Sequence, residues 1–308
     1  MIELVVEAAD DGEKLDRIVA RALDVSRRIA RIVIGEGAVT VNGKPWKIIA
    51  KPVRAGAKVV IDRSREAVAE QQPRNEPVLE RERILHWDRE VVVVDKPSGL
   101  LSETDRIGSI SLQTLVPKLL ATMNERNRDL WLVHRLDAGT SGVIVMARTA
   151  AAARKLDATF RDARAVKRYL AICNGRLSDE RDVDAPIGRA QGTRHKVDPE
   201  QGKQAFTKLV PRAVGTIATL VEARPRTGRT HQIRVHAAHV GHPILGDRLY
   251  GGPVYTASTP PLAIGRVMLH AHSLVVPHPA SGKSIEWIAA PPKDLVALAT
   301  TLGLERGL

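Results

Sequence analysis

The chain of 308 residues contains 47 lysines and arginines against 35 aspartates and glutamates, which gives a formal net charge of +12. Its 44% hydrophobic and 27% charged residues are typical of a folded globular protein, and its length suggests two domains. The single cysteine, Cys173, excludes an intramolecular disulfide and argues against a zinc–thiolate site. No apolar run approaches the roughly 18 residues of a membrane span, and the acidic first residues lack the basic start of a signal peptide. We therefore expect a soluble, cytoplasmic protein that prefers polyanions.

The positive charge is concentrated near the amino terminus. Residues 1–13 contain five acidic residues and no lysine or arginine, whereas residues 14–61 contain eleven basic residues and three acidic ones. A compact basic module beside a larger, mildly basic body is expected of a protein that binds nucleic acid. The alternative is that these basic residues form a solvated charged face that binds no nucleic acid.

Hydrophobic periodicity predicts two short helices in this basic segment. Apolar residues recur at helical spacing over 15–23, and Ser26 is a plausible N-cap for a second helix that contains Ile29, Ile32 and Val33. The alternating string AVTVNGKP, with a turn at Asn42–Gly43, and the later string AKVVI predict a small sheet. Basic side chains on such a module can contact phosphates across an RNA groove, and the candidates are Arg27, Arg28, Arg31 and Lys44.

The phrase SRRIARIVIGEGAVTVNGKP resembles the core of the S-four-type RNA-binding domain, a small ααβ module. The resemblance covers about 50 residues and implies that residues 1–62 form an RNA-binding domain. A basic helical cap without an RNA role remains the alternative. Residues 63–79 are polar, contain two prolines and have no periodicity, so they are interpreted as a linker.

Residues 80–308 are expected to form a second domain of the α+β class. Its predicted strands and helices are mixed without a regular βαβ rhythm. The expected strands begin with a four-valine run at 91–94 and continue at 142–147, 169–173, 216–223 and 273–278, and the expected helices lie at 149–160 and 231–240.

The string LVHRLDAGTSGVIVMART, residues 132–149, places polar side chains and two glycines directly before an apolar strand. Gly139 and Gly142 permit tight turns, and Thr140 or Ser141 can bond to a carboxylate or to the main chain. Such a loop can present Asp137 into a cleft. Alternatively, the aspartate and the hydroxyl side chains of this loop serve only as caps of the turn.

The segment HRLDAGTSG matches the H-R-L-D-x-x-T-S-G signature of the RluA-type pseudouridine synthases, which convert uridine in RNA to its carbon-linked isomer. Further strings that resemble this family occur in the same order, namely VVVVDKPSG, KRYLAICNG, PIGR, RPRTGRTHQIRVHAAHVGHPILGDRLYG and MLHAHSL. The resemblance spans about residues 84–290 and implies a mixed, largely antiparallel sheet with flanking helices. The string LLSETDRIGSISLQ departs from the family pattern, which leaves the contacts of that loop in doubt.

The resemblance implies that Asp137 is the essential catalytic carboxylate. A carboxylate can attack the ribose, attack carbon 6 of the base, or act as a base, and these three roles stay open here. Arg135 matches the position that enters the RNA and helps to flip the target nucleotide, and a phosphate-contacting surface arginine is its alternative. No metal or other cofactor is implied, because substrate and product are isomers.

The resemblance also assigns residues outside this loop. Tyr169 matches the active-site tyrosine that stacks on the uracil and removes the proton from carbon 5, although a core tyrosine would have the same sequence context. Arg234 matches the arginine that pairs with the catalytic aspartate and keeps it ionised. Both residues are therefore grouped with Asp137 as catalytic.

The segment 228–241 is expected to contact the substrate. Thr230 is expected to cap a helix that runs to Val240, with Gly241 following it. Ile233 is expected beneath the base, and the candidate RNA contacts beside Thr140 and Thr230 are Gly228, Arg229 and Gln232. The spacing of His231, His236, His239 and His242 does not match an i, i+4 metal pair, so no metal site is predicted.

The sequence thus predicts an RNA pseudouridine synthase that modifies large-subunit (23S) ribosomal RNA and is a monomer. Transfer RNA or another structured RNA is the alternative substrate. A non-catalytic RNA-binding or ribosome-assembly factor with the same fold is the alternative function, followed by a metal-dependent hydrolase.

Overall fold

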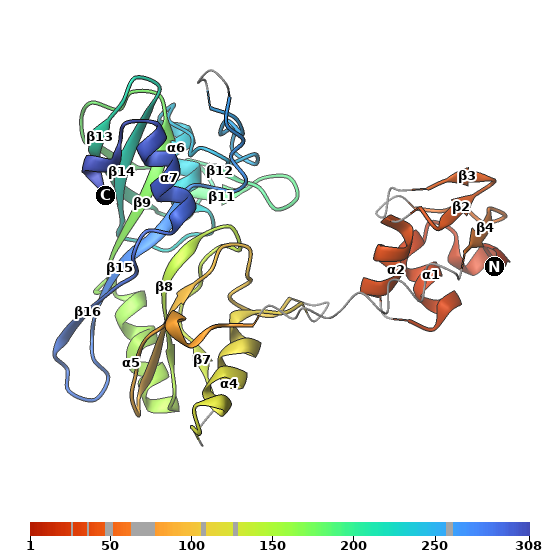
Figure 1. Cartoon of the computed structure of the whole chain (residues 1–308), viewed down its shortest axis with the longest axis horizontal. Coiled ribbons are helices and arrows are strands. Elements are labelled where there is room, and N and C mark those ends of the chain that lie inside the picture. Colours follow the sequence, from red (N-terminus) through yellow and green to blue (C-terminus); the bar gives the residue numbers. More distant parts are fainter. Residues whose placement is uncertain are drawn as a thin grey trace. The chain divides into compact units, whose positions relative to one another are not determined.

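A computed structural model describes residues 1–25, 27–35, 37–46, 52–62, 78–105, 109–125, 129–256 and 261–308, and the side chains of Arg28, Ile29 and Ile32 are outside this description. The internal contacts divide the chain into two units, Met1–Glu76 and Pro77–Leu308, which are coloured red to orange and orange to blue in Figure 1. Most of the segment expected to be a linker, residues 63–77, lies outside the described residues.

The N-terminal unit packs two helices against a four-stranded sheet of order β1-β4-β2-β3 (Figure 1). Its elements are β1 (Ile2–Val5), α1 (Leu15–Leu23), α2 (Arg27–Gly35), β2 (Val39–Val41), β3 (Lys44–Pro45) and β4 (Lys58–Ile61). The predicted helix over 15–23 and the turn between β2 and β3 are confirmed, and Asn42 and Gly43 both adopt the positive φ that a two-residue hairpin turn of this type requires. The expected N-cap, Ser26, lies outside the described residues.

A buried ion-pair cluster ties the two helices together. Asp16 on α1 is fully buried, and its Oδ2 accepts hydrogen bonds from Arg27 at 2.9 Å and Arg31 at 2.6 Å on α2. Each arginine side chain keeps about a third of its surface exposed, at 33% and 35%. Arg27 and Arg31 therefore stabilise the helix pair and still present part of each guanidinium side chain to solvent. Lys44 is exposed on β3.

The C-terminal unit is built on a ten-stranded mixed sheet. Its main path runs β10-β13-β14-β9-β15-β8-β6-β5, with β16 paired to β15 and β7 to β8. Among the described pairs, β15 with β8 is parallel and the other pairs are antiparallel. The strands are β5 (Ile84–Trp87), β6 (Val91–Lys96), β7 (Trp131–Leu132), β8 (Ser141–Ala147), β9 (Val166–Asn174), β10 (Arg181–Asp184), β13 (Phe206–Val214), β14 (Ala218–Pro225), β15 (Leu269–Pro277) and β16 (Ser284–Ile288). A separate hairpin joins β11 (Ile187–Arg189) to β12 (His195–Val197).

Helices cover both faces of this sheet (Figure 1). Successive valines of β6 point to opposite faces: Val92 and Val94 pack in the core that includes α4 (Leu112–Thr122), and Val91 and Val93 pack in the core that includes α5 (Ala150–Arg161). A third core joins β9, β13 and β14 to α6 (Gln232–His239) and α7 (Lys293–Thr301). The α+β class is therefore confirmed.

Most of the expected elements are present, with small shifts of their ends. The predicted helix at 149–160 is α5, and Thr149 caps it by accepting a hydrogen bond from the amide of Ala152. The predicted strand at 216–223 begins two residues later, at Ala218. Helices α4 and α7 and strand β13 have no counterpart in the sequence-based prediction.

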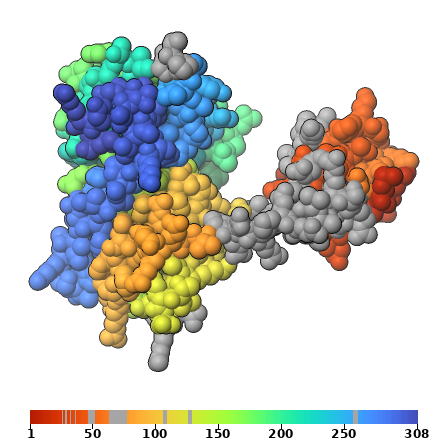
Figure 2. Space-filling model, viewed as in Figure 1, coloured from red at the N-terminus to blue at the C-terminus, as the bar shows by residue number. Residues whose placement is uncertain are grey.

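Segments distant in the sequence lie side by side at the edge formed by β5 and β16. Figure 2 shows the orange residues that follow Pro77 next to the blue C-terminal strands. His278 donates from Nε2 to Asp88 Oδ2 at 2.8 Å, which fixes the turn after β5 to the end of β15. Within the described residues, no helix is both long and apolar enough to cross a membrane.

Candidate active site

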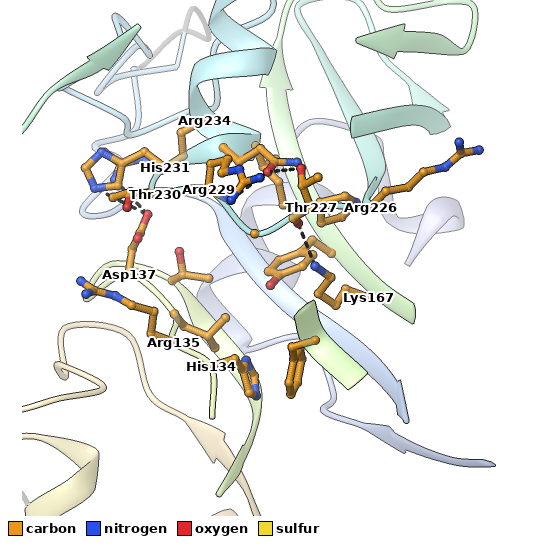
Figure 3. Close-up of a pocket in the computed structure, with 18 of the residues that line it drawn as sticks. His134, Arg135, Asp137, Lys167, Arg226, Thr227, Arg229, Thr230, His231 and Arg234 are labelled. Carbon is orange, nitrogen blue, oxygen red and sulfur yellow. Dashed lines mark hydrogen bonds and ion pairs between the residues drawn. The ribbon is translucent and has the colours of Figure 1, made fainter. Parts of the chain in front are cut away.

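A cavity of about 490 Å³ lies where three segments of the C-terminal unit meet, and its size suits a small-molecule or nucleotide ligand (Figure 3). One wall is the loop before β8, the second comes from the end of α5 and from β9, and the third is the end of β14 with the start of α6. Its lining includes the predicted residues Arg135, Asp137, Thr140, Tyr169, Gly228, Arg229, Thr230, Gln232, Ile233 and Arg234.

The loop that carries Asp137 is held by the segment after β6. The amide of Gly99 donates to the carbonyl of Ala138 at 2.8 Å, and the Ser98 hydroxyl donates to the carbonyl of Gly139 at 2.9 Å. Within the loop, the amide of Thr140 donates to the carbonyl of Asp137 at 3.0 Å, and the Thr140 side chain is buried. These three hydrogen bonds to the loop backbone fix the position of the loop independently of the contacts of the Asp137 side chain.

Lys96 lies behind this loop and is fully buried. Its ammonium group donates to three carbonyl oxygens, those of Leu100 at 2.7 Å, Pro97 at 3.0 Å and Ala138 at 3.2 Å. Burial lowers the pKa of Lys96 to about 7, against the opposing charge of Asp137. Lys96 thus joins the strand β6, the segment that follows it and the Asp137 loop at one point.

Asp137 faces two cationic or hydrogen-bond-donating side chains (Figure 3). Its Oδ2 accepts a hydrogen bond from Nη1 of Arg234 at 3.2 Å and lies 3.8 Å from Nε2 of His231. The Asp137 side chain retains 22% of its surface, so it is accessible from the cavity. The predicted pairing of Arg234 with Asp137 therefore matches the geometry of the site.

Lys167 and Tyr169 are two residues apart on the strand β9, so their side chains share one face, and both form part of the cavity wall. Burial, followed by the negative charge of Asp137, raises the pKa of the Tyr169 hydroxyl. Lys167 donates to the carbonyl of Thr227 at 2.8 Å, and burial lowers the pKa of Lys167 to about 8. A neutral phenol and a partly buried lysine side chain therefore border this cavity.

The start of α6 differs from the sequence-based expectation. The N-cap is His231 in the left-handed conformation, with no side-chain capping bond, and Thr230 is exposed, so the prediction of a Thr230 cap is wrong. The side chain of Gln232 is buried and makes hydrogen bonds to Thr227, Arg229, Phe206 and Thr207. We therefore assign Gln232 to holding this loop rather than to contacting RNA. Its neighbours Gly228 and Arg229 are exposed at the cavity, and Ile233 is buried beneath it.

His134 and Arg135, two adjacent residues of the signature, face different surroundings. His134 stacks on Phe160 with ring centroids 4.5 Å apart, and its Nε2 accepts the amide hydrogen of Val145 at 3.0 Å. Burial lowers the pKa of His134 to about 3, so this ring is a neutral structural group. Arg135 is exposed at the cavity and directs its guanidinium away from Asp137 (Figure 3).

The histidines near α6 have separate partners. His236 is buried between Thr207 and the carbonyl of Ala185, and His242 contacts the carbonyl of Asn174. In the part of the chain that the structure describes, the cluster with metal-ligand geometry is instead His86, Asp88 and His278, at the β5–β16 edge. That cluster is distant in the fold from the cavity and includes none of its lining residues.

The structure brings to the site several residues to which the sequence alone gives no role. Lys96 and Lys167 lie inside strings quoted for the family resemblance, and Asp247 and Tyr250 lie in the string GDRLYG. From the sequence, His231 is a candidate only for metal binding. Several of their partners are distant in the sequence, such as Ala138 for Lys96 and Thr227 for Lys167, so the available signal is membership of these strings and not spacing.

Comparisons with known proteins identify both units. Residues 90–239 match the family model described as RNA pseudouridylate synthase, and residues 13–59 match the S4 domain. The ribosomal large subunit pseudouridine synthase D of Yersinia pestis is 33% identical over 94% of this chain and 91% of its own length. The chain belongs to the RNA pseudouridylate synthase family. It carries an S4 domain at its amino terminus.

Other members of the family are similar over most of the chain. The ribosomal large subunit pseudouridine synthase C of Vibrio parahaemolyticus is 32% identical over 89% of this chain and 88% of its own length. The structure of human RNA Pseudouridylate Synthase Domain Containing 4 covers 72% of this chain and 93% of its own, with a TM-score of 0.60 and 26% identity. The protein is thus an RNA pseudouridine synthase, an isomerase that acts on RNA.

Proposed function

We propose that this RNA pseudouridine synthase isomerises uridines of large-subunit ribosomal RNA, and that Asp137 is its catalytic carboxylate. The observation that carries the proposal is the contact of Asp137 with Arg234 at the wall of the cavity, inside the complete string HRLDAGTSG. The substrate is supported by relatives that are named for the large ribosomal subunit and align over about nine-tenths of the chain. We further propose that the enzyme acts as a monomer in the cytoplasm.

The reaction moves one bond and one proton. The bond between ribose C1′ and base N1 breaks, a bond between C1′ and C5 forms, the C5 proton is lost and N1 gains a proton. Because substrate and product are isomers, the net reaction requires no oxidant and no group donor. The carboxylate of Asp137 serves as the nucleophile or base, and the hydrogen bond from Arg234 holds it in place at the cavity.

We propose that the other cavity residues bind and expose the nucleotide. Arg135 is exposed at the rim and is placed to occupy the space of a flipped nucleotide, a movement that costs a few kcal/mol of unstacking. Tyr169 forms the wall on which the uracil stacks. Since the pKa of Tyr169 is raised, its phenol stays protonated near neutral pH, and we assign stacking rather than proton removal to it. The S4 domain supplies further phosphate contacts through Arg31, Lys44 and neighbouring basic residues.

Tritium release tests this proposal, because the C5 hydrogen leaves during the reaction. The purified full-length chain is incubated with unmodified transcripts of bacterial large-subunit ribosomal RNA or of transfer RNA, each labelled with [5-³H]uridine. We expect release from the ribosomal transcript, none with Asp137→Asn, and wild-type release with Asp157→Asn, which alters an exposed carboxylate on α5. Release from transfer RNA alone would refute the substrate, and full activity of Asp137→Asn would refute the assigned residue.

A further inference from the structure

The turn that follows α6 contains two side chains that reach back to the catalytic pair. The backbone of this turn is fixed: the amide of Asp247 donates to the carbonyl of Ile244 at 3.1 Å, and the amide of Gly252 donates to the carbonyl of Asp247 at 2.8 Å. Gly246 adopts φ +80°, and a Cβ at this position would overlap the carbonyl of Arg266. The turn therefore holds Asp247 and Tyr250 at defined positions.

Asp247 occupies one edge of the Arg234 guanidinium. Its two carboxylate oxygens accept hydrogen bonds from Nε at 2.7 Å and from Nη2 at 2.8 Å, and Asp247 is fully buried. A guanidinium is planar and offers its donors in a rigid fork, so this bidentate bond fixes the plane of the group. The remaining nitrogen, Nη1, then points to Asp137 at 3.2 Å. The direction of the Arg234–Asp137 bond is thus set by Asp247.

Tyr250 contacts both groups that face Asp137. The guanidinium carbon of Arg234 lies 5.0 Å from the centre of its ring, and its hydroxyl lies 2.7 Å from Nδ1 of His231. The same hydroxyl oxygen accepts the amide hydrogen of His195 at 3.0 Å, which leaves the hydroxyl hydrogen available for Nδ1. In that arrangement the ring hydrogen of His231 is on Nε2, the atom that lies 3.8 Å from Oδ2 of Asp137.

We propose that Asp247 and Tyr250 are positioning residues for the reaction, since they aim Arg234 and His231 at a single oxygen, Oδ2, of Asp137. Oδ1 carries neither of these contacts and is the oxygen we assign to the chemistry. The inference rests on the proposed function, because it concerns how Asp137 performs the isomerisation. A displacement of about 1 Å in such a group can reduce a rate by about 100-fold, so loss of either positioning residue affects turnover more than RNA binding.

The test uses full-length variants in the tritium-release assay, with kcat and KM measured for the RNA that the wild type modifies. Tyr250→Phe removes one hydroxyl and keeps the ring under Arg234, and Tyr255→Phe is its control on an exposed tyrosine. Asp247→Asn removes the charge that fixes Arg234, and Asp294→Asn is its control, since Asp294 makes a bidentate pair with Arg266 outside the cavity. Thermal unfolding of each variant monitors its fold. We expect Tyr250→Phe and Asp247→Asn to lower kcat by about tenfold or more, with KM within about twofold of wild type.

A double-mutant cycle tests the route through His231. His231→Asn retains a residue type that tolerates the left-handed conformation at φ 57°. If Tyr250 acts through His231, the double variant Tyr250→Phe/His231→Asn loses no more kcat than His231→Asn alone. Additive losses, a change in KM alone, or wild-type kcat in Tyr250→Phe and Asp247→Asn would overturn the inference. An inactive wild type or an active Asp137→Asn variant would instead overturn the proposed function.

Discussion

Gly142 gives the sharpest structural prediction for the Asp137 loop. This glycine is the second residue of β8, pairs with Ala271 in the parallel contact between β8 and β15, and has φ +114°. A Cβ at this position would lie 2.7 Å from the backbone nitrogen and carbonyl carbon of Ala271, and still closer to its oxygen. Since ordinary Cβ contacts begin near 3.4 Å, Gly142→Ala must move β8 away from β15 by at least about 0.7 Å.

The control is Gly282→Ala, because Gly282 also has a positive φ, +69°, but has no atom within 4 Å of the added Cβ. Backbone strain costs about 1–2 kcal/mol at Gly282, whose φ lies in the left-handed region, and at least about as much at Gly142. We expect the steric overlap to add roughly 2 kcal/mol or more at Gly142. Urea unfolding measures this difference. We also expect kcat to fall by about 10- to 100-fold in Gly142→Ala alone, because Gly142 lies only five residues after Asp137 and its movement displaces the Asp137 loop. Equal stability and equal kcat of the two variants would refute the close approach of β8 and β15.

Three further predictions concern buried charge and RNA binding. Burial lowers the pKa of Lys96 from its ordinary value of 10.5 to about 7, so between these pH values the unfolded chain binds more protons than the folded chain. The free energy of unfolding should therefore rise with pH by a few kcal/mol across that window. Urea unfolding at pH 7 and pH 9.5 measures this rise, and Lys96→Met should abolish it. Asp16→Ala leaves two arginines without their buried partner and should destabilise the N-terminal unit by about 2–3 kcal/mol, which amide hydrogen exchange of that unit measures. The control is Glu13→Ala, which removes only an exposed ion pair and should leave the hydrogen exchange of the N-terminal unit unchanged. Deletion of residues 1–62 should weaken RNA binding and flatten its dependence on salt, because the S4 domain concentrates basic residues; an unchanged salt slope would contradict this role.

Local periodicity was sufficient to predict several elements, and it failed where tertiary contacts override it. Helix α1 has apolar residues at regular helical spacing, and the strands β6 and β8 contain uninterrupted apolar runs, so all three could be predicted from the sequence. Helix α4 contains Pro117 in its interior, which argues against a helix, yet a capping box at Ser111 and a buried apolar face stabilise it. Strand β13 contains Pro211 at an irregularity of its pairing with β14, which interrupts a simple alternating pattern.

The candidate site was predicted in part because its residues belong to strings that resemble a family. Asp137, Tyr169 and Arg234 come from a loop, a strand and a helix, and their spacing in the sequence carries no information about their meeting at one cavity. The expected cap at Thr230 was wrong because His231 adopts the left-handed conformation, which directs its ring to Asp137 and Tyr250 instead of extending the helix. A sequence pattern could not reveal this conformation, since it depends on partners from other segments.

Partners from distant segments also determine how Asp137 is held in the site. Asp137 is an accessible carboxylate, but the groups that orient it become progressively more buried: its side chain is 22% exposed, that of Arg234 is 10% and that of Asp247 is 1%. Buried charges are stable only when they are paired with good geometry, and the bidentate bond between Arg234 and Asp247 meets this condition. Because the Arg234–Asp247 pair is buried and Asp137 is not, RNA can reach Asp137 without disturbing the bond that aims Arg234. The site thus combines access for a large polyanion with a fixed direction for the carboxylate that we propose as catalytic.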